Sequence, residues 1–453
     1  MRVGEEVSLE VESLADGPDA LCRLGNYVVF VAGALPGEKI RARVTSAARK
    51  YGRADLLEVE RRSPLRVGPK CEHFLDCGGC HFQHLEYAAQ LEHKTSRLAK
   101  TLGFALRASS LPILDMKGPE DPWGQRNKIA LHLQGRRGAA QAGLFRMHSR
   151  DVVPIRMCPV QDDFGTEVAF RAADAINAAG IEPWNAADDE GSLRAIVVRA
   201  TKTTKQAQVT LVTRRRVPRI EKLVNDLARA GASGVAINLN ERPGPMLMGR
   251  ETTVLAGNPR IAEKIGGVTY LSSPGAFFQT SSWGAAFLVD AIRRLDDAPA
   301  TARVVDLYSG GGLLSLALAD RVREVIGHEE KPGAVGDAVA SARANGFANT
   351  HFLSGKAELR IREISAQGAP PYAVVLDPPR EGCDPRVIDA VVRMRPERIV
   401  YVSCDPVALG RDLSLFTERG YDLERVEPLD MFPHAFHIEA IAVLEPRRAR
   451  RSA

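Results

Sequence analysis

The sequence predicts an α/β protein of several domains, and three observations support this fold class. The chain has 453 residues, which is too long for one ordinary hydrophobic core and suggests two or three domains. Its first part alternates apolar and polar residues in short runs between glycine and proline turns, which is typical of a small antiparallel barrel. Its last part alternates short apolar strands with amphipathic helices, which indicates βαβ units and a doubly wound parallel sheet. A mixed α+β region is expected between these two parts.

The composition is that of an ordinary globular protein, with 45% hydrophobic and 26% charged residues. No apolar run approaches the length needed to span a bilayer, and the first residues, MRVGEEVSLEVESL, are acidic and alternating, unlike a signal peptide. We therefore expect a cytoplasmic protein with no membrane partner. The net charge of +5 is compatible with a nucleic-acid partner but does not by itself indicate one.

Residues 1–62 are expected to form the barrel, with an OB-like fold. The alternating runs are EVSLEVESL, YVVFVAGAL, KIRARVTSA and DLLEVE. The stretch from Arg41 to Arg53 holds five basic residues, no acid and Tyr51, and such a strip suits the phosphate backbone of RNA. A solvated barrel edge would show the same composition. Both interpretations stay open, and RNA binding is favoured.

Residues 63–100 contain a cysteine-rich segment, CEHFLDCGGC, followed by a helical pattern. The chain has seven cysteines, and an odd number scattered over a cytoplasmic chain argues against a disulfide framework. Cys71, Cys77 and Cys80 are closely spaced, with two glycines that allow the chain to wrap, which favours metal or cluster binding over a plain loop. Cys158 is the one cysteine left in the middle of the chain as a fourth ligand. Zinc and an iron–sulfur cluster would accept the same four sulfurs, so the residues alone leave both open.

The helical pattern is LEYAAQLEHKTSRLAKTLG, and Gly103 is expected to mark its end. Residues 101–270 then form the mixed α+β region, with strands such as NKIALHLQ, AGLFRM, LRAIVVRATK and QAQVTLVT and helical patterns such as RIEKLVNDLARAG. The basic run from Arg214 to Arg219 fits a solvated loop as well as a nucleic-acid contact. The C-terminal tail PRRARRSA is expected to be disordered.

Residues 271–453 are expected to form the parallel sheet. The strand ending in VVDLYSGGG runs directly into the helical pattern LLSLALA, so Asp306, Gly310 and Gly312 lie at the first strand-to-helix turn. In an open parallel sheet this turn is where nucleotide-like ligands bind. The spacing differs from GxGxxG, which favours S-adenosylmethionine over a dinucleotide. A glycine turn alone also suits a structural role, but Glu329 at the end of the next strand can accept hydrogen bonds from ribose hydroxyls.

A second short motif, DPPR from Asp377 to Arg380, follows the apolar strand YAVVL. Asp377 is therefore expected at the carboxyl edge of the sheet, in a loop that two prolines hold rigid. Many methyltransferases that act on planar amines carry an aromatic residue after the two prolines, where it stacks on the target base. The basic residue Arg380 at that position argues against amino-group methylation.

Cys404 in VSCDP and Glu439 in HIEAIAVL complete a set with Asp377 at the same sheet edge. A cysteine after a buried strand is usually a small core residue, but the flanking serine, aspartate and proline predict a polar exposed turn. A thiol nucleophile, a polar clamp and a general base are what chemistry at carbon 5 of a pyrimidine needs. The ring must first be attacked at carbon 6, and a carbon-bound proton must then be removed. Cys383 in REGCDP is interpreted as a bystander.

The chain resembles, over essentially its whole length, the bacterial RNA uracil-5-methyltransferases that use S-adenosylmethionine, in particular the iron–sulfur-containing 23S rRNA branch with an N-terminal TRAM domain. The motifs that carry the resemblance are CEHFLDCGGCHFQH, QRNKIALHL, GLFRMHS, SPGAFFQTS, DLYSGGG, VIGHE, LDPPREG, YVSCDP and DMFPHAFHIEAIAVL. They follow in family order, and the last two are highly specific. The resemblance implies a Rossmann-like class I methyltransferase domain, an OB-like TRAM barrel and a central α+β RNA-binding domain.

Carried over position by position, the resemblance implies roles for ten side chains. Cys404 is the implied nucleophile and Glu439 the implied base. The implied S-adenosylmethionine contacts are Gln279, Tyr308, Glu329 and Asp377. The implied ligands of a 4Fe-4S cluster are Cys71, Cys77, Cys80 and Cys158. Three positions depart from the family pattern, namely Ser309, Leu313 and Lys356, and the last two are left out of the predicted site.

The implied reaction is methyl transfer to carbon 5 of a specific uridine in 23S rRNA, through a covalent bond between Cys404 and carbon 6. The target base must be flipped out of a stack or lie in a loop. A tRNA uridine is an alternative target, and a non-catalytic RNA-binding iron–sulfur protein is a second alternative that the intact Cys404 and Glu439 speak against. A radical enzyme is disfavoured because four cysteines would close the cluster. The protein is expected to be monomeric.

Overall fold

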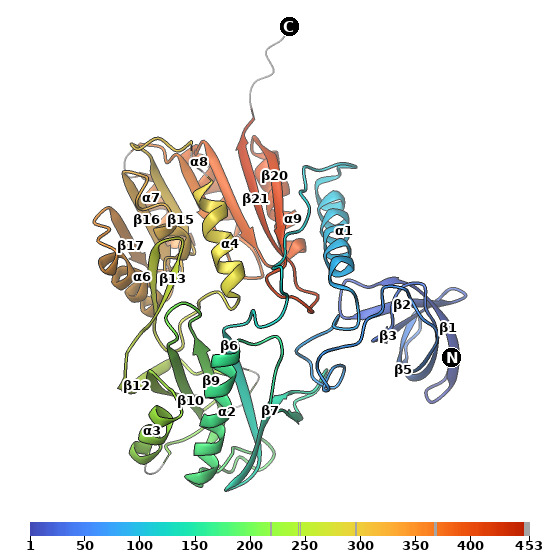
Figure 1. The fold of residues 1–453 in the computed structure, drawn as a ribbon. Helices are drawn as coiled ribbons and strands as arrows, with labels where there is room; N and C mark the ends of the chain where they lie inside the picture. The colour runs from blue at the N-terminus through green and yellow to red at the C-terminus, as the bar shows by residue number, and fades with distance from the viewer. Residues whose placement is uncertain (218–219, 243, 245, 295–296, 367–368, 448–453) are drawn as a thin grey trace.

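The computed structural model arranges the chain in three parts, with a small barrel at one side of the molecule (Figure 1). The described residues are 1–217, 220–242, 244, 246–294, 297–366 and 369–447. Two positions of the basic run, Pro218 and Arg219, lie outside the described residues, as does the predicted disordered tail after residue 447.

The N-terminal barrel is closed by five strands in the order β1-β2-β3-β5-β4. Their bounds are β1 (Glu6–Leu14), β2 (Asp19–Leu24), β3 (Tyr27–Ala32), β4 (Lys39–Ala47) and β5 (Tyr51–Arg61). Alternate residues point inward, so the interior is filled by apolar side chains such as Val7, Val29 and Ile40. The predicted barrel is confirmed, with the addition that β3 and β5 pair in parallel.

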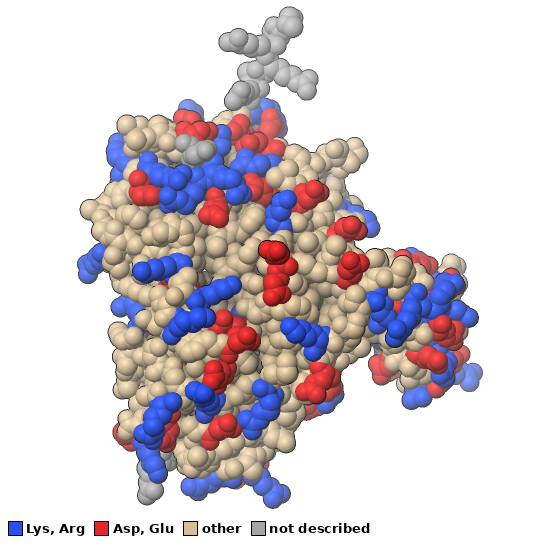
Figure 2. Space-filling model, viewed as in Figure 1, with Lys and Arg blue, Asp and Glu red and all other residues tan. Residues whose placement is uncertain are grey.

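Three of the five basic residues in the predicted RNA-binding strip are paired with carboxylates. Arg41 and Arg43 both contact Glu6, and Arg53 lies 2.5 Å from the buried carboxylate of Asp19. The other two are exposed in the turn between β4 and β5. Figure 2 accordingly shows basic and acidic side chains mixed on the barrel, the lobe at the right. A solvated barrel edge accounts for the paired residues, and RNA contact by the strip stays a prediction.

The cysteine-rich segment, residues 62–86, contains no regular helix or strand and connects the barrel to the rest of the chain. Phe82 is fully buried in a small apolar cluster with Leu35 of the barrel. The N–H of Gly78 donates to the carbonyl of Phe145 in the central region. The segment therefore packs against two parts of the protein at once.

Helix α1 (Tyr87–Leu106) follows the cysteine-rich segment and extends past its predicted end. Gly103 lies inside the helix, and its carbonyl accepts the N–H of Arg107, whose left-handed backbone (φ 52°) ends the helix. The expectation that Gly103 terminates the helix is therefore wrong. The glycine instead permits close approach of the chain, because a Cβ atom there would lie 3.1 Å from the carbonyl oxygen of Ala108.

The central region is built on a seven-stranded mixed sheet in the order β12-β11-β10-β9-β6-β7-β8. Its strands are β6 (Lys128–Arg136), β7 (Ala139–Phe145), β8 (Val152–Pro154), β9 (Leu193–Ala200), β10 (Ala207–Thr213), β11 (Gly234–Leu239) and β12 (Glu251–Gly257). Helices α2 (Asp163–Ala178) and α3 (Ile220–Arg229) pack on one face through an apolar cluster that includes Ile129, Val198 and Leu211. The predicted α+β architecture is confirmed.

The C-terminal region is a doubly wound sheet in the order β17-β16-β15-β18-β19-β21-β20. Its strands are β15 (Arg303–Leu307), β16 (Glu324–Glu329), β17 (Thr350–Ser354), β18 (Ala373–Leu376), β19 (Arg398–Ser403), β20 (Tyr421–Leu429) and β21 (Glu439–Pro446). The strands from β17 to β19 are parallel, and β21 runs antiparallel to both of its neighbours. The predicted parallel sheet is confirmed, and its last strand reverses direction.

Helices cover both faces of this sheet. Those on one face are α4 (Ser282–Arg293), α5 (Leu313–Ala317) and α6 (Pro332–Ala344), together with the hairpin of β13 (Ile261–Ile265) and β14 (Val268–Ser272). Those on the other face are α1, α7 (Ala357–Ala366), α8 (Pro385–Met394) and α9 (Pro406–Glu418). Because both faces are covered, strand β18 is a continuous apolar run. No described helix combines the length and the apolar character needed to cross a membrane.

Candidate active site

The carboxyl edge of the C-terminal sheet brings the predicted site residues together. The winding of the sheet changes direction between β15 and β18, and ligands of open α/β sheets bind at such a switch point. Strand β21 runs antiparallel to β19, so its first residue, Glu439, lies at this same edge. Ser403 pairs with Ala440 in this register, which places the next residue, Cys404, beside Glu439.

The turn after β15 contains a fully buried acid. The hydroxyl of Ser315 donates to Oδ2 of Asp306, whereas Oδ1 has no hydrogen-bond partner among the described residues. Burial raises the pKa of Asp306 to about 7, against the opposing effect of the Ser315 hydrogen bond. Gly310 and Gly312 both have positive φ angles, 54° and 84°, which suit glycine at this sharp turn.

Glu329, Asp377 and Gln279 lie close to this turn. The carboxylate of Glu329 accepts the N–H of Gly310 at 3.1 Å and the N–H of Lys331 at 2.8 Å. Part of Asp377 is exposed, yet burial, with the charge of Glu329 added, raises the pKa of Asp377 to about 7. Nε2 of Gln279 lies 3.5 Å from Oδ2 of Asp377. The structure therefore groups these three predicted cofactor contacts.

Cys404 lies in a turn that is half-buried rather than fully exposed. The predicted polar surroundings arise because Asp405 caps α9 by accepting two backbone N–H groups. Burial raises the pKa of the Cys404 thiol to about 11, and the nearby Glu439 adds to this rise. Arg380 opposes both effects through its charge and a hydrogen bond to the thiol. The guanidinium is thus the group that favours the thiolate.

Glu439 is only 4% exposed. Burial and the neighbouring Asp377 raise the pKa of Glu439 well above its ordinary value, and Arg380 again acts in the opposite direction. The predicted nucleophile, the predicted base and one cation therefore form a single electrostatic group at the sheet edge.

The loop between β20 and β21, which leads into Glu439, is held by α1 and by the cysteine-rich segment. Nζ of Lys94 lies 2.7 Å from Oδ1 of Asp430, and both side chains are fully buried. The side chain of Gln90 accepts the N–H of His434 at 3.1 Å. The N–H of His81, next to the last cysteine of the segment, donates to the carbonyl of His434 at 2.7 Å. The position of the predicted base thus depends on residues more than 300 positions earlier in the chain.

Tyr308 and the three departures from the family pattern occupy different environments. Tyr308 has a positive φ of 65° and packs against the apolar cluster under α8 and α9. Burial raises the pKa of Tyr308 far above its ordinary value. Leu313 is buried in the hydrophobic core, Lys356 is exposed, and the hydroxyl of Ser309 is buried with no partner among the described residues. Core packing therefore accounts for the apolar residue at position 313.

The four predicted cluster ligands share one neighbourhood. They are Cys71, Cys77, Cys80 and Cys158. Burial is the main cause of the raised pKa values of Cys71, Cys77 and Cys158, and the charges of neighbouring thiols raise these values further. Nη1 of Arg126 donates to the carbonyl of Gly79 at 3.1 Å, and the backbone N–H of Arg126 donates to the carbonyl of Val160. Arg126 thus joins the two loops that carry the cysteines. Within the described residues no three His, Cys, Asp or Glu side chains are arranged to hold a metal ion. All seven cysteines are free thiols.

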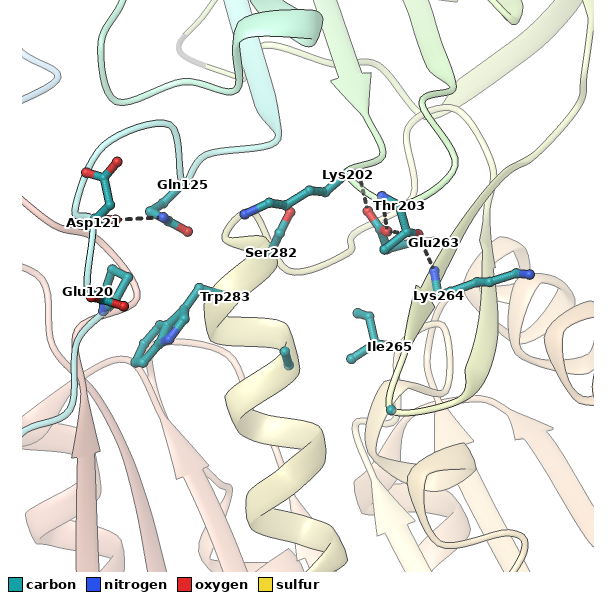
Figure 3. A pocket seen from close by; sticks show the side chains of 13 residues that line it. Glu120, Asp121, Gln125, Lys202, Thr203, Glu263, Lys264, Ile265, Ser282 and Trp283 are labelled. Carbon is teal, nitrogen blue, oxygen red and sulfur yellow. Dashed lines mark hydrogen bonds between the residues drawn. The ribbon is translucent and has the colours of Figure 1, made fainter.

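A cavity of about 370 Å³ lies between the central region and α4 (Figure 3). Its lining residues do not include the predicted catalytic or cofactor-binding side chains. Its buried acid, Glu263 on β13, accepts the N–H groups of Lys202 and Thr203 and so holds the turn after β9. We therefore assign no reaction to this cavity.

Sequence reasoning does not find two further residues at the site. In the sequence, Arg380 stands out only because it replaces an aromatic residue that other methyltransferases carry. Its position in the same motif as Asp377 nevertheless signals that this cation lies beside Cys404. Nδ2 of Asn127 donates to the carbonyl of Gln279 at 3.1 Å and joins the central sheet to the site. No local pattern signals this contact, because the two residues are 152 positions apart.

Comparison with known proteins identifies two family models along the chain. The model of tRNA (uracil-5-)-methyltransferases matches residues 203–447, and the TRAM domain model matches residues 1–57. An uncharacterized RNA methyltransferase of Halalkalibacterium halodurans is 33% identical over 442 residues, covering 97% of this chain and 96% of that protein. A similarly named protein of Listeria innocua is 33% identical and covers 98% of both chains.

The same fold is found in a solved structure. The crystal structure of Pyrococcus abyssi tRNA (uracil-54, C5)-methyltransferase in complex with S-adenosyl-L-homocysteine matches with a TM-score of 0.77 and 29% identity, covering 96% of this chain and 99% of that one. This similarity confirms the predicted class I methyltransferase fold, and the TRAM match confirms the predicted barrel type. The chain is therefore an RNA methyltransferase that belongs to the tRNA (uracil-5-)-methyltransferase family and carries a TRAM domain.

Proposed function

We propose that this enzyme transfers a methyl group from S-adenosylmethionine to carbon 5 of a specific uridine in 23S rRNA, with Cys404 as nucleophile and Glu439 as base. The pairing of β19 with β21 is the observation that carries the proposal, because it sets a thiol beside a buried carboxyl group. These two groups suit attack at carbon 6 and proton removal at carbon 5.

The carboxyl-rich turn fits a ligand that carries positive charge. Asp306, Glu329 and Asp377 lie near one another, their charges disfavour joint ionisation, and Oδ1 of Asp306 has no hydrogen-bond partner among the described residues. When bound, S-adenosylmethionine supplies a methyl group on a positively charged sulfur. We propose that it is held by Gln279, Tyr308, Glu329 and Asp377. The two oxygens of Glu329 retain acceptor capacity for hydroxyl groups after accepting their backbone N–H bonds.

The covalent steps follow from the positions of the two catalytic side chains. The Cys404 thiolate forms a sulfur–carbon bond with carbon 6 of the uracil, and the ring electrons make carbon 5 nucleophilic. Carbon 5 then takes the methyl group, and the electron pair of the broken sulfur–methyl bond stays on the sulfur of S-adenosylhomocysteine, which leaves. Glu439 removes the carbon 5 proton, the electron pair restores the double bond to carbon 6, and the thiolate leaves. Burial raises the pKa of Glu439 well above its ordinary value, so its carboxylate accepts a proton more readily than an exposed carboxylate does.

We propose that four parts of the chain divide the work. Residues 1–62 and 101–270 bind RNA, residues 63–100 carry the cluster, and residues 271–453 perform catalysis. The target base is unreachable inside a stack, so RNA contacts must offset a flipping cost of a few kcal/mol.

We propose that the four neighbouring thiols hold a 4Fe-4S cluster with a structural role. Four thiols around a loop that also supports the base-bearing segment through His81 favour this assignment. Zinc is the alternative, because it accepts the same four sulfurs. Anaerobically purified protein should be brown with about four irons per chain, and Cys77→Ser should bleach it. Colourless protein with one zinc per chain would overturn the cluster.

The choice of 23S rRNA over tRNA rests on the cysteine-rich segment, whose motif resembles the iron–sulfur rRNA branch. A tRNA uridine is the second candidate, because the solved Pyrococcus abyssi relative is named as a tRNA enzyme. Mass mapping of 5-methyluridine in both RNA classes from a deletion strain decides between them. Loss from 23S rRNA is expected, and loss from tRNA alone would contradict the proposed target.

Trapping with 5-fluorouridine RNA tests the catalytic proposal, because fluorine cannot leave carbon 5 as the proton does. The wild-type enzyme should form a stable covalent complex. Cys404→Ala should abolish both the complex and methylation while leaving the fold and S-adenosylmethionine binding intact. A covalent complex formed by Cys404→Ala would show that the nucleophile is assigned to the wrong residue.

A further inference from the structure

Two cations on the central sheet, one buried and one partly buried, have no carboxylate partner among the described residues. Lys128 on β6 and Arg199 on β9 are directly paired across the sheet, and Arg199 is only 8% exposed. Arg199 donates one hydrogen bond, from Nη1 to Oδ1 of Asn127 at 3.3 Å. Lysine and arginine are rarely buried without an opposite charge. Lys94, by contrast, is fully buried with Asp430 as its partner at 2.7 Å.

The unpaired cations belong to a row of hydrogen-bond donors across three strands. Arg199 is paired with Gln208 on β10, so the side chains of Lys128, Arg199 and Gln208 point to the same face of the sheet. Gln208 is 3% exposed, and its Nε2 has no hydrogen-bond partner among the described residues. This face is opposite to the one on which α2 and α3 pack through the alternate residue Val198.

A small cavity lies against this row. It is lined by the three donors, by Thr210, and by residues 273–276 of the loop that leads to the active site, and its volume is about 20 Å³. Such a volume admits one water-sized group, for which a single phosphate oxygen is suitable. Lys128 is partly exposed, so the row is reachable from solvent at that end.

The row is connected to the active site by direct contacts. Asn127, which accepts from Arg199, donates to the carbonyl of Gln279, and Gln279 lies 3.5 Å from Asp377. The guanidinium of Arg199 lies 6.0 Å from the ring centre of Phe278. A group held by the row would therefore be connected, through Asn127, to the predicted cofactor contact Gln279.

The pKa shifts of the two cations in the row fit a binding site for an anion. Burial, together with the charge of Arg199, lowers the pKa of Lys128 to about 8. Burial also lowers the pKa of Arg199 to about 10. A negative charge between the two would oppose both shifts, because it favours the charged forms of the two side chains.

We propose that Lys128, Arg199 and Gln208 form a clamp for one RNA phosphodiester group beside the target uridine, an inference that rests on the proposed function. The clamp holds the backbone while the base turns toward Cys404. Phosphate contacts of this kind fix register and orientation and carry no base specificity.

Binding measurements with Lys128→Met test the clamp, in a Cys404→Ala background so that no covalent bond forms. The affinity for substrate RNA should fall by about tenfold, and the slope of affinity against salt should fall by about one. Lys222→Met is the matched control, because Lys222 is an exposed lysine of α3 on the opposite face of the sheet, and it should change neither quantity. Arg199→Gln serves as a second variant.

Measurements of thermal stability distinguish a variant that has lost an RNA contact from a variant that is misfolded. Lys128→Met removes a partly buried charge without a carboxylate partner, so the thermal stability of the variant should equal or exceed that of the parent protein. A variant that binds RNA weakly because it is poorly folded would instead show a lower melting temperature, and Arg199→Gln would then decide the matter by the same two measurements.

Single methylphosphonate linkages identify the bound group. A neutral linkage at one of the phosphates flanking the target uridine should weaken binding to the parent protein and have little further effect on Lys128→Met. Equal losses of RNA affinity for the parent protein and Lys128→Met at every linkage would overturn the clamp. Inorganic phosphate that stabilises the protein through Lys128, with no linkage-dependent loss, would assign a free-anion site instead.

The outcomes distinguish this inference from the proposed function. Wild-type enzyme that traps 5-fluorouridine RNA, with a Lys128→Met variant that binds RNA normally, would refute the clamp and leave the reaction in place. The expected linkage-dependent loss without any trapped complex would support the clamp and refute the covalent mechanism.

Discussion

Lys94 of α1 and Asp430 form a fully buried ion pair, with 2.7 Å between Nζ and Oδ1. Lys94 also donates to the carbonyl of Phe432 at 3.3 Å. Both partners lie at the start of the loop that leads to Glu439, so the pair ties that loop to the helix after the cysteine-rich segment. A buried ion pair adds little net stability relative to apolar packing, and its attested use is to fix one arrangement. We infer that this pair sets where the base-bearing strand begins.

Lys94→Met should destabilise the protein by about 3–5 kcal/mol, because it leaves the Asp430 charge buried without its partner. Denaturant unfolding monitored by circular dichroism measures this loss. The double variant Lys94→Met with Asp430→Asn should recover much of the stability while activity stays low, because the loop loses its anchor. Equal stability of Lys94→Met and the parent protein would contradict this account.

Arg380 should control the reactivity of the Cys404 thiol. The pKa of Cys404 is raised to about 11 by burial and by Glu439, so the thiolate fraction and the alkylation rate should rise about tenfold per pH unit between pH 7 and 9. Arg380→Gln removes the opposing charge and should slow alkylation by about tenfold, which corresponds to one pKa unit.

Mass spectrometry of the peptide that carries Cys404, after timed iodoacetamide treatment, measures this rate without RNA. Arg380→Lys should retain part of it because the positive charge remains. An alkylation midpoint below pH 8 in the parent protein, or an unchanged rate in Arg380→Gln, would exclude this role for the guanidinium.

The elements of the fold could be predicted because their signals are local. Alternation predicts the barrel, and short apolar strands between amphipathic helices predict the doubly wound sheet. The glycine turn after Asp306 and the polar residues after each strand indicate which ends carry chemistry. The contacts that complete the site are different, because they join residues far apart in the chain, as Asn127 and Gln279 or Lys94 and Asp430 do.

The burial of a side chain and the residue at which a helix ends also depend on packing, which no local sequence pattern contains. The polar sequence around Cys404 suggests exposure, but the cap of α9 and the neighbouring strand half-bury the thiol. Gly103 suggests a helix end, but the helix continues to Leu106 and ends at the left-handed residue Arg107. The basic strip suggests RNA, whereas acids on other strands of the barrel pair with three of its members.

Asp306→Asn should stabilise the protein at pH 8 and have little effect at pH 4. The pKa of Asp306 is raised from 3.8 to about 7 by burial, so the folded state keeps this proton while the unfolded state loses it above about pH 4. Stability contributed by the protonated group is therefore lost progressively as the pH rises from 4 to 7. The full shift corresponds to at most about 4 kcal/mol.

Thermal unfolding of both proteins at pH 4 and pH 8 measures the difference, and calorimetry with S-adenosylmethionine follows the cofactor. We expect Asp306→Asn to be more stable than the parent protein at pH 8 and to bind S-adenosylmethionine more weakly, because the substitution removes a negative charge from the proposed site of the positively charged ligand. A stability gain that is the same at both pH values would show that Asp306 does not titrate in this range.

Glu439→Gln separates the two halves of the proposed reaction. Cys404 remains free to attack and carbon 5 remains free to take the methyl group, but the carbon 5 proton stays and elimination stalls. Enzyme should therefore accumulate covalently bound to methylated RNA that contains ordinary uridine, without any fluorine substitution. A denaturing gel with a labelled methyl donor should show this species as a slow, labelled band.

The double variant Glu439→Gln with Cys404→Ala is the control, and it should show no band because the sulfur–carbon bond cannot form. The other role open to Glu439 is that of a structural carboxyl at the start of β21, where it is 4% exposed. In that case Glu439→Gln, which keeps the size and hydrogen-bonding capacity of the side chain, would fold and turn over normally. Normal turnover without a labelled band would thus remove Glu439 from the mechanism, whereas a stalled methylated complex requires a base at this position.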